Sequence, residues 1–254
     1  MGNWIRSVSH DLTPKTENMK TKISLLFFFL AFGISNAFAH ALWIETASTG
    51  KKGQAQEVKV FFGEYESNEP DSAAKWFSNL KAFSLVLTAP NGTTTVLTST
   101  PDVRFFKASF TPDQDGSYKL SVVHEVADIY EKAKIEYYAF ADVAVGNAKI
   151  NTVYPSTAAL TIRPDKHTLK VGETSVHQVI YNKTPFAKQK LTVVNTDRKA
   201  QPTETDADGK FTFKPEQKGN YFFEAFTEEK NPGKLNGKDY DKVWHLVTYT
   251  TEVK

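Results

Sequence analysis

Cysteine is absent from the 254 residues of this chain, and its absence excludes several kinds of chemistry. Disulfide bonds, thiolate metal sites and cysteine nucleophiles all require a thiol. Any metal ion must therefore be held by nitrogen and oxygen ligands. The common sequence signatures of serine hydrolases, phosphate-binding loops and helical zinc proteases are missing as well, so we expect a protein that is not an enzyme.

A strong charge imbalance is also missing. The chain has 31 basic and 29 acidic residues, and loss of residues 1–39 would remove four basic and two acidic ones, leaving 27 of each. A neutral chain offers no overall attraction to polyphosphate, so we expect no nucleic-acid partner. The most apolar stretch, Ile23–Ile34, is shorter than the ~20 residues that cross a bilayer. The sequence therefore predicts no membrane anchor.

Residues 19–39 have the three parts of a secretory signal peptide. Two lysines precede the apolar stretch, and Ala37–Ala39 fits the small-residue pattern at which such signals are cleaved. Residues 1–18 fit no part of a signal, which indicates that Met19 is the natural start and that the preceding residues are a spurious extension. We therefore expect a soluble periplasmic protein whose mature chain begins at His40.

One motif occurs twice in the mature chain. The segments Phe110–Tyr118 and Phe213–Tyr221 share Phe, Pro, an acid, Gln, Gly and Tyr in the same order, 103 positions apart. A single repeat of this length argues for two related domains. In each copy the glycine marks a turn and the tyrosine opens an alternating run, as in the tyrosine corner of immunoglobulin-like sandwiches.

The rest of the chain supports an all-β fold. Turn signals such as Pro90-Asn91-Gly92 and Asn236-Gly237 separate short runs rich in Val, Thr and Phe. These runs predict strands within residues 57–62, 82–88, 160–162 and 191–194. Residues 71–80 have a helical composition and predict a short helical turn on a loop.

Together the repeat and the strand pattern predict two immunoglobulin-like β-sandwich domains in tandem. We expect the first sandwich over residues 40–145 and the second over residues 155–254. Residues 146–154 would form the joint between them. Two sandwiches joined in this way are a scaffold, so candidate functional groups are sought on loops and at chain ends.

His40 is the candidate functional residue, because cleavage would leave it with a free α-amine beside its imidazole. The reference pKa of an α-amine is about 7.7–8.0, so it is partly deprotonated at neutral pH and can chelate together with a ring nitrogen. Amine and imidazole nitrogens suit Cu(II), Ni(II) or Zn(II). We therefore predict a divalent metal ion, nickel, copper or zinc, as the bound species.

The amine and imidazole of His40 give a metal ion only two ligands, so tight binding requires further ligands. His124, in strand phase after Val122, and His245, in the final strand, are the candidate second imidazoles, and Glu64 could supply an oxygen. His167 and His177 are expected to be surface or half-buried strand residues. The alternative remains open that each histidine is only a hydrogen-bonded structural residue.

The chain resembles a bacterial periplasmic family that is formally a domain of unknown function and whose members are often described as nickel-uptake-associated proteins. The resemblance rests on four stretches: His40–Glu45, Val60–Glu64, Val171–Glu173 and Thr205–Phe211. It implies a secreted, two-domain, all-β protein whose processed histidine end binds a divalent metal ion, with a membrane metal transporter as partner. The second half, through Thr184–Ala187 and Asp208–Phe211, also resembles a carboxypeptidase-regulatory-type sandwich.

The sequence departs from the related nickel-transport subunits at one position. Those subunits carry histidine third in the chain, whereas the third residue after the expected cleavage is Leu42. Nickel, copper and zinc therefore all remain candidates. Two other functions stay open: a glycan- or protein-binding adhesion module, and a copper monooxygenase in which a second histidine completes a brace with the terminal one.

Overall fold

The structure is a computed structural model that describes residues 1–2 and 40–254. The expected signal peptide and its cleavage site lie outside the described residues. Within the described part, 20 strands form four sheets and the only helices are two short 3-10 turns, so the all-β prediction is confirmed. No helix in this part is long and apolar enough to cross a membrane.

The first outer sheet is built from the beginning of the described chain. Its order is β1-β3-β8-β7, with β4 added beside β3. The strands are β1 (Ala41–Glu45), β3 (Gln56–Glu64), β4 (Glu69–Pro70), β7 (Thr100–Pro101) and β8 (Phe106–Phe110). Two 3-10 turns follow β4. η1 (Ala73–Lys75) lies within residues 71–80, for which a helical turn was predicted, whereas η2 (Leu80–Ala82) begins at the last of these residues and ends at Ala82, where a strand was predicted to begin.

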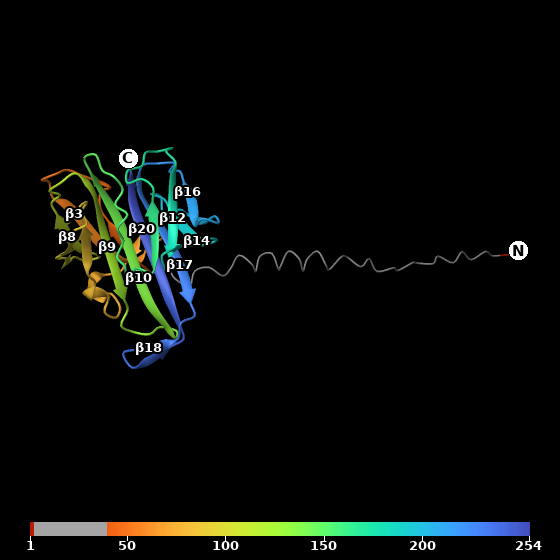
Figure 1. Cartoon of the computed structure of the whole chain (residues 1–254). Coiled ribbons are helices and arrows are strands. Elements are labelled where there is room, and N and C mark those ends of the chain that lie inside the picture. The colour runs from red at the N-terminus through yellow and green to blue at the C-terminus, as the bar shows by residue number, and fades with distance from the viewer. Residues whose placement is uncertain (3–39) are drawn as a thin grey trace. The chain divides into compact units, whose positions relative to one another are not determined.

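The central sheet contains strands from both halves of the chain. Its order is β15-β14-β17-β20-β10-β9-β5-β6, with β2 added beside β10, and its long strands stand side by side in Figure 1. The strands are β2 (Thr49–Gly50), β5 (Leu85–Thr88), β6 (Thr94–Leu97), β9 (Gly116–Glu125), β10 (Ala133–Val145), β14 (Lys190–Val194), β15 (Ala200–Glu204), β17 (Gly219–Glu229) and β20 (Lys242–Val253).

The second outer sheet and a small hairpin complete the fold. The second outer sheet has the order β11-β12-β13, with β16 beside β12. Its strands are β11 (Leu160–Pro164), β12 (Ser175–Tyr181), β13 (Thr184–Pro185) and β16 (Lys210–Phe213). The hairpin pairs β18 (Gly233–Leu235) with β19 (Lys238–Tyr240) around the predicted Asn236-Gly237 turn, in which both residues have positive φ.

The two halves repeat one arrangement of strands. In the first half, an outer sheet with β1, β3 and β8 accompanies β6, β5, β9 and β10 of the central sheet; in the second, an outer sheet with β11, β12 and β16 accompanies β15, β14, β17 and β20. This is the layering of an immunoglobulin-like sandwich. The repeated tyrosines behave as predicted: the hydroxyl of Tyr118 donates to the Gln114 carbonyl at 3.2 Å, and that of Tyr221 to the Gln217 carbonyl at 3.1 Å.

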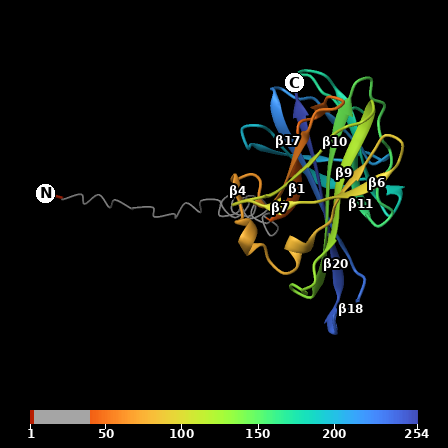
Figure 2. The ribbon, with the colours of Figure 1, turned by 90° about the vertical axis from the view of Figure 1, so that its left-hand side faces the viewer.

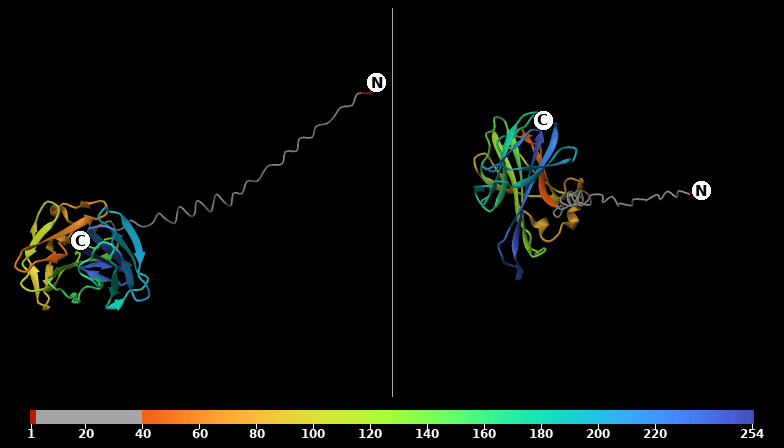
Figure 3. Two further views of the ribbon diagram at one scale, coloured as in Figure 1. Left: turned by 90° about the horizontal axis from the view of Figure 1, so that it is seen from above. Right: turned by 90° about the vertical axis from the view of Figure 1, so that its right-hand side faces the viewer.

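The outer sheets cover opposite faces of the central sheet. On β10, Tyr137 packs its ring against Phe62 of β3 at 5.7 Å, whereas its neighbour Tyr138 belongs to the core cluster with Leu160 and Ile162 of β11. Successive side chains of a strand point to opposite faces, so the two sandwich cores lie on either side of β10. Figure 2 views the side that carries β1, and Figure 3 adds the view from above and from the opposite side.

The expected joint does not separate two independent sheets. β10 pairs in parallel with β20, from Ala133 opposite Lys242 to Ala141 opposite Thr250, and thereby connects the halves through the central sheet. The first half also reaches over the second, because the Thr248 hydroxyl donates to the Leu42 carbonyl at 2.8 Å. Both β10 and β20 are buried along almost their whole length, as is typical of parallel strands covered on two faces.

Candidate functional site

His40 immediately precedes β1 and lies beside the end of β3. Ala41 pairs with Gly63, so the antiparallel register brings His40 opposite Glu64. Nδ1 of His40 lies 4.0 Å from Oε1 of Glu64. Side chains opposite one another on antiparallel strands have Cβ atoms about 4.5–5.5 Å apart, so this contact follows from the register.

A second carboxylate reaches the same imidazole from β4. Gly63 pairs with Pro70, and the Asp71 N–H donates to the Phe62 carbonyl at 2.8 Å. Oδ2 of Asp71 consequently lies 3.7 Å from Nε2 of His40. Gly63 has a φ of +139°, and a Cβ there would lie 2.7 Å from the Asp71 nitrogen. Glycine therefore permits the close approach that positions Asp71.

The backbone of His40 is held in place while its imidazole stays open to solvent. The Tyr137 hydroxyl donates to the His40 carbonyl at 3.4 Å, and the His40 ring lies 5.5 Å from that of Phe62. The side chains of His40, Glu64 and Asp71 are 48%, 39% and 37% exposed. An ion from solution could reach all three.

The chemistry of this cluster is that of a nitrogen and oxygen donor set. Both His40–carboxylate distances exceed the ~2.7–3.2 Å of a hydrogen bond, so the ring nitrogens are not used up by these neighbours. Yet among residues 1–2 and 40–254 no three His, Asp or Glu side chains are arranged so that they could hold a metal ion together. Metal binding at His40 therefore needs one donor more than these side chains provide.

Sequence reasoning did not identify Asp71 as a site residue. It assigned residues 71–80 to a helical turn on a loop, and η1 lies within that range. Asp71 comes to His40 only because the two-residue strand β4 pairs with the end of β3. A strand this short leaves no periodic pattern in the sequence.

His124 has a structural hydrogen bond instead of a place beside His40. Its Nε2 lies 3.1 Å from Oδ1 of Asn79, an acceptor that also receives the Ala127 N–H at 2.8 Å. Nε2 therefore donates and is not free to bind a metal ion. Burial lowers the pKa of His124, which is 8% exposed. No hydrogen bond, ion pair or ring contact joins His124 to His40 in the described part of the chain.

His245 lies on the opposite face of the central sheet from His40. Its Nδ1 lies 2.9 Å from the Tyr138 hydroxyl and 3.3 Å from Oε2 of Glu136, and its Nε2 lies 3.3 Å from Oε2 of Glu229. Tyr138 belongs to the core between the central and second outer sheets. The structure thus brings Glu64 to His40 but does not bring His245 there.

The expectation of surface or half-buried positions for the other two histidines is wrong. His167 is 6% exposed, and its Nδ1 lies 4.0 Å from Oδ2 of the buried Asp142. His177 is fully buried among aromatic rings of the second sandwich. His177 points to the inner side of β12, which the one-residue alternation of a strand decides and composition does not. His167 lies on no strand but in the loop between β11 and β12, where its Nδ1 lies 3.4 Å from the Ser117 hydroxyl oxygen.

Comparison with known proteins identifies a family but no function. The family model described as Domain of unknown function (DUF4198) matches residues 37–229. No curated protein matches the chain.

Similarity to solved structures is distant. A mutant of Salmonella alpha-2-macroglobulin has 11% identity and a TM-score of 0.30, over 85% of this chain and 15% of that one. A DUF4785 family protein from Legionella pneumophila has 14% identity and a TM-score of 0.29, over 72% of this chain and 50% of that one. The chain thus spans half or less of these proteins. Because the matched residues 37–229 make up most of the chain and include His40, Glu64 and Asp71, the protein belongs to the DUF4198 family.

Proposed function

We propose that the mature protein binds a divalent transition-metal ion, nickel, copper or zinc, in the periplasm, and that this ion is its cargo. The observation that supports the proposal is the 4.0 Å separation of His40 Nδ1 and Glu64 Oε1 at a half-exposed position. Zinc–nitrogen bonds of about 2.0–2.1 Å and zinc–oxygen bonds of about 2.0–2.2 Å place two ligand atoms of a tetrahedral ion about 3.4 Å apart, so the two side chains would need to approach by about 0.6 Å. An ion could therefore bridge the two side chains with little movement of either.

Processing would supply the donor that the side chains lack. Cleavage before His40 would release an α-amine, which chelates a metal ion together with Nδ1 of the same residue, and Glu64 would add an oxygen ligand. Asp71 faces the other ring nitrogen, Nε2, at 3.7 Å. A carboxylate in that position holds a metal-binding imidazole in the tautomer that leaves the ligating nitrogen free. Asp71 is therefore a positioning residue.

The exposure of the site suits transport or buffering of the ion. A half-exposed His40 leaves the ion accessible to ligand exchange, as delivery to a partner requires. A membrane metal transporter is the expected partner. Without a thiolate, the donor set favours Cu(II), Ni(II) and Zn(II) over Cu(I).

The decisive experiment compares two forms of the protein that differ at the chain end. Ni(II), Cu(II) and Zn(II) are titrated by calorimetry into protein that begins at His40 and into protein that retains one residue before it. We expect the extra residue to weaken the tightest binding by about 100-fold or more, because an amide nitrogen replaces the amine. Equal affinities of the two forms would contradict the proposal.

Three single substitutions test the roles of the carboxylates. Glu64→Gln and Asp71→Asn should each weaken binding by about 10- to 100-fold, the range found when a ligand's supporting groups are changed. Glu216→Gln is the matched control, because Glu216 is exposed between β16 and β17 and forms no hydrogen bond or ion pair among the described residues. A loss of binding in the control equal to that in Glu64→Gln would show that net charge and not ligation matters.

No observation favours the other two functions. A histidine brace needs a second imidazole, whereas the charged groups that the described chain places within 4.0 Å of the His40 ring nitrogens are the carboxylates of Glu64 and Asp71. A glycan platform would need a patch of exposed aromatic rings. In the described chain only Phe77 and Tyr130 exceed a third exposure among aromatic side chains, and they lie on different loops.

A further inference from the structure

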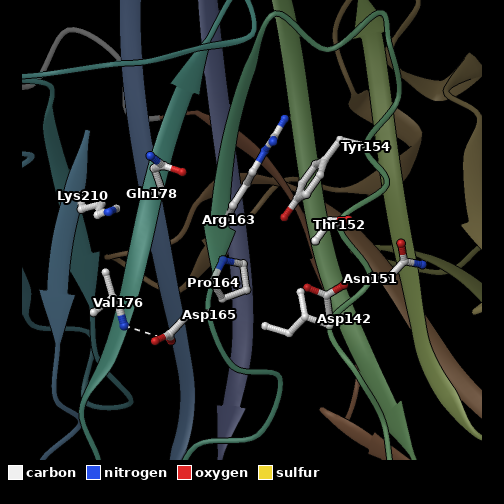
Figure 4. A pocket seen from close by; sticks show the side chains of 11 residues that line it. Asp142, Asn151, Thr152, Tyr154, Arg163, Pro164, Asp165, Val176, Gln178 and Lys210 are labelled. Carbon is white, nitrogen blue, oxygen red and sulfur yellow. Dashed lines mark hydrogen bonds between the residues drawn. The ribbon is translucent and has the colours of Figure 1, made fainter. Parts of the chain in front are cut away.

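A pocket of about 360 Å³ lies on the second half of the chain, on the other side of the central sheet from His40. It is bounded by the segment 150–154, by the end of β11 and by the outward face of β12 and β16 (Figure 4). Gln178 faces outward into it because its neighbour His177 points into the core. The volume falls within the ~300–1,000 Å³ typical of small-ligand sites.

One end of the pocket holds a guanidinium without an acidic partner. Nε of Arg163 donates to the Thr161 hydroxyl at 3.2 Å, and its Cζ lies 4.7 Å from the centre of the Tyr154 ring. Tyr154 is itself fixed, since its hydroxyl donates to the Ile162 carbonyl at 3.3 Å. Arg163 forms no ion pair within the part of the chain that the structure describes. Its two terminal amino groups therefore remain free, in the planar fork that matches a carboxylate.

The strand register places a second cation, Lys210, in the same row as Arg163, with Gln178 between them. Arg163 pairs with Gln178, and Gln178 pairs with Lys210, so the three side chains form one row across β11, β12 and β16. The Lys210 ammonium lies 3.9 Å from Oδ2 of Asp208, and both groups are well exposed, so this ion pair is weak. The row therefore attracts an anionic group.

A carboxylate without a cationic partner lies at the other end. Oδ1 of Asp165 accepts the Ser175 hydroxyl at 2.6 Å and the Val176 N–H at 2.9 Å, and Asp165 forms no ion pair with Lys or Arg among the described residues. Figure 4 shows the Arg163 guanidinium beside Tyr154, with Asp165 and Asp142 at the opposite end. Asp142 is already neutralised, because Lys119 lies 2.7 Å from it.

We propose that this pocket binds a zwitterion of amino-acid or short-peptide size, with its carboxylate on Arg163 and its ammonium on Asp165. Neither protein charge has a partner of opposite charge among the described residues, so a ligand with opposite charges at its two ends satisfies both. Alternate residues of a strand are about 6.6 Å apart, and these two side chains diverge, so the charges of the ligand lie farther apart than in one α-amino acid. Each peptide residue adds up to ~3.3–3.6 Å, which favours a dipeptide or tripeptide.

Oligoglycines of one to four residues are the probes, because they change only the separation of the two charges. Calorimetric titration of the purified protein should show the tightest binding for diglycine or triglycine. N-acetylated and C-amidated forms of that peptide each lack one charge and should bind at least about tenfold more weakly. These comparisons use the unaltered protein, so they remain decisive if a variant fails to fold. They also separate a free amino acid from a peptide as the ligand.

Variants test the two ends of the pocket separately. Arg163→Gln and Asp165→Asn should each reduce the affinity at least about tenfold, whereas Lys214→Gln, an exposed lysine just after β16, should leave it unchanged. Absence of saturable binding by any oligoglycine up to about 10 mM, ten times a weak dissociation constant of ~1 mM, would overturn the proposal. Equal binding of the free and the acetylated peptide would do the same. The metal titrations at His40 are a separate test.

Discussion

The buried His177 should make the stability of this protein fall in mild acid. It lies on β12 with its ring 4.6 Å from that of Phe223 and 5.2 Å from that of Phe211. In the described chain neither of its ring nitrogens has a hydrogen-bond partner. Burial lowers the pKa of His177 to about 4, and the more distant Asp165 carboxylate offsets this only in part.

The size and sign of the effect follow from that pKa. An unfolded histidine has a pKa of about 6.5, so between that value and about 4 the unfolded chain binds a proton that the folded chain does not. The stability that depends on neutral His177 is therefore complete above about pH 6.5 and is lost as the pH falls towards 4. A difference of about 2.5 pKa units at 1.36 kcal/mol each gives a full effect of about 3.4 kcal/mol, of which about 2.5 kcal/mol applies at pH 4.5.

Urea denaturation of the unaltered protein and of His177→Phe, at pH 7.5 and at pH 4.5, measures this effect. Phenylalanine fills similar space among the same rings and does not titrate. The free energy of unfolding should drop between the two pH values by about 2.5 kcal/mol less in the variant than in the unaltered protein. Other groups, including His124 and His167, whose pKa values burial also lowers, cancel in this difference.

A second apolar variant, His177→Leu, distinguishes the loss of the titrating group from a change in local packing. His177→Leu should show the same reduced dependence on pH even if its stability at pH 7.5 is lower. Equal pH dependence of all three proteins, within about 0.5 kcal/mol, would refute the reasoning, because His177 would then accept a proton in the folded state without cost.

Three further predictions concern a buried ion pair, the two tyrosine corners and the glycine beside the candidate site. Asp142→Asn should destabilise the protein by about 3–5 kcal/mol in urea denaturation, because it would leave the buried Lys119 as an unpaired charge. Lys119 is 1% exposed, and despite this burial Asp142 keeps the pKa of Lys119 above its ordinary value. Replacement of both residues by leucine should cost less. Tyr118→Phe should lower the melting temperature more than Tyr221→Phe, at about 0.5–1.5 kcal/mol per hydrogen bond lost. The Tyr118 hydroxyl accepts the N–H groups of Asp113 and Gln114, both at 3.1 Å, whereas that of Tyr221 accepts the Gln217 N–H at 3.3 Å; equal losses would contradict this. Gly63→Ala should cost about 1–3 kcal/mol of stability and weaken metal binding, since the new methyl group would displace β4 and Asp71. Gly172→Ala is the control: Gly172 also has positive φ, but no described atom lies within 4 Å of the new Cβ. This variant should cost less and leave metal binding unchanged.

Much of the fold could be predicted because its determinants are local. The alternation of Tyr118, Leu120 and Val122 and the turn at Asn236-Gly237 each lie within a few residues, and the structure confirms both, together with the tyrosine corners. The strand predicted at residues 82–88 begins only at Leu85. The repeat also predicted the duplicated arrangement of strands. For the candidate site, the contact between His40 and Glu64 could be anticipated because β1 and β3 are near neighbours in the sequence.

The rest depended on contacts between residues far apart in the chain. β10 and β20 are buried along almost their whole length, but β10 contains Lys, Glu and Asp and half of β20 is polar, so no local pattern indicated a shared parallel sheet. Asp71 needed β4, whose two residues are too few for a pattern. A shift of one residue in the strand register would move the His245 side chain to the other face of the central sheet, away from Tyr138.

The amino-acid sequence by itself determined the all-β class, the internal repeat, the turns and the histidine that we expect at the processed end. Each of these depends only on residues that are close together along the chain. Only the tertiary structure decided that both halves share one central sheet, that Asp71 joins Glu64 beside His40, and that Arg163 and Asp165 line one pocket on the other side. The reason is that strand pairing over long sequence separations is selected by the burial of whole faces, which no local pattern specifies.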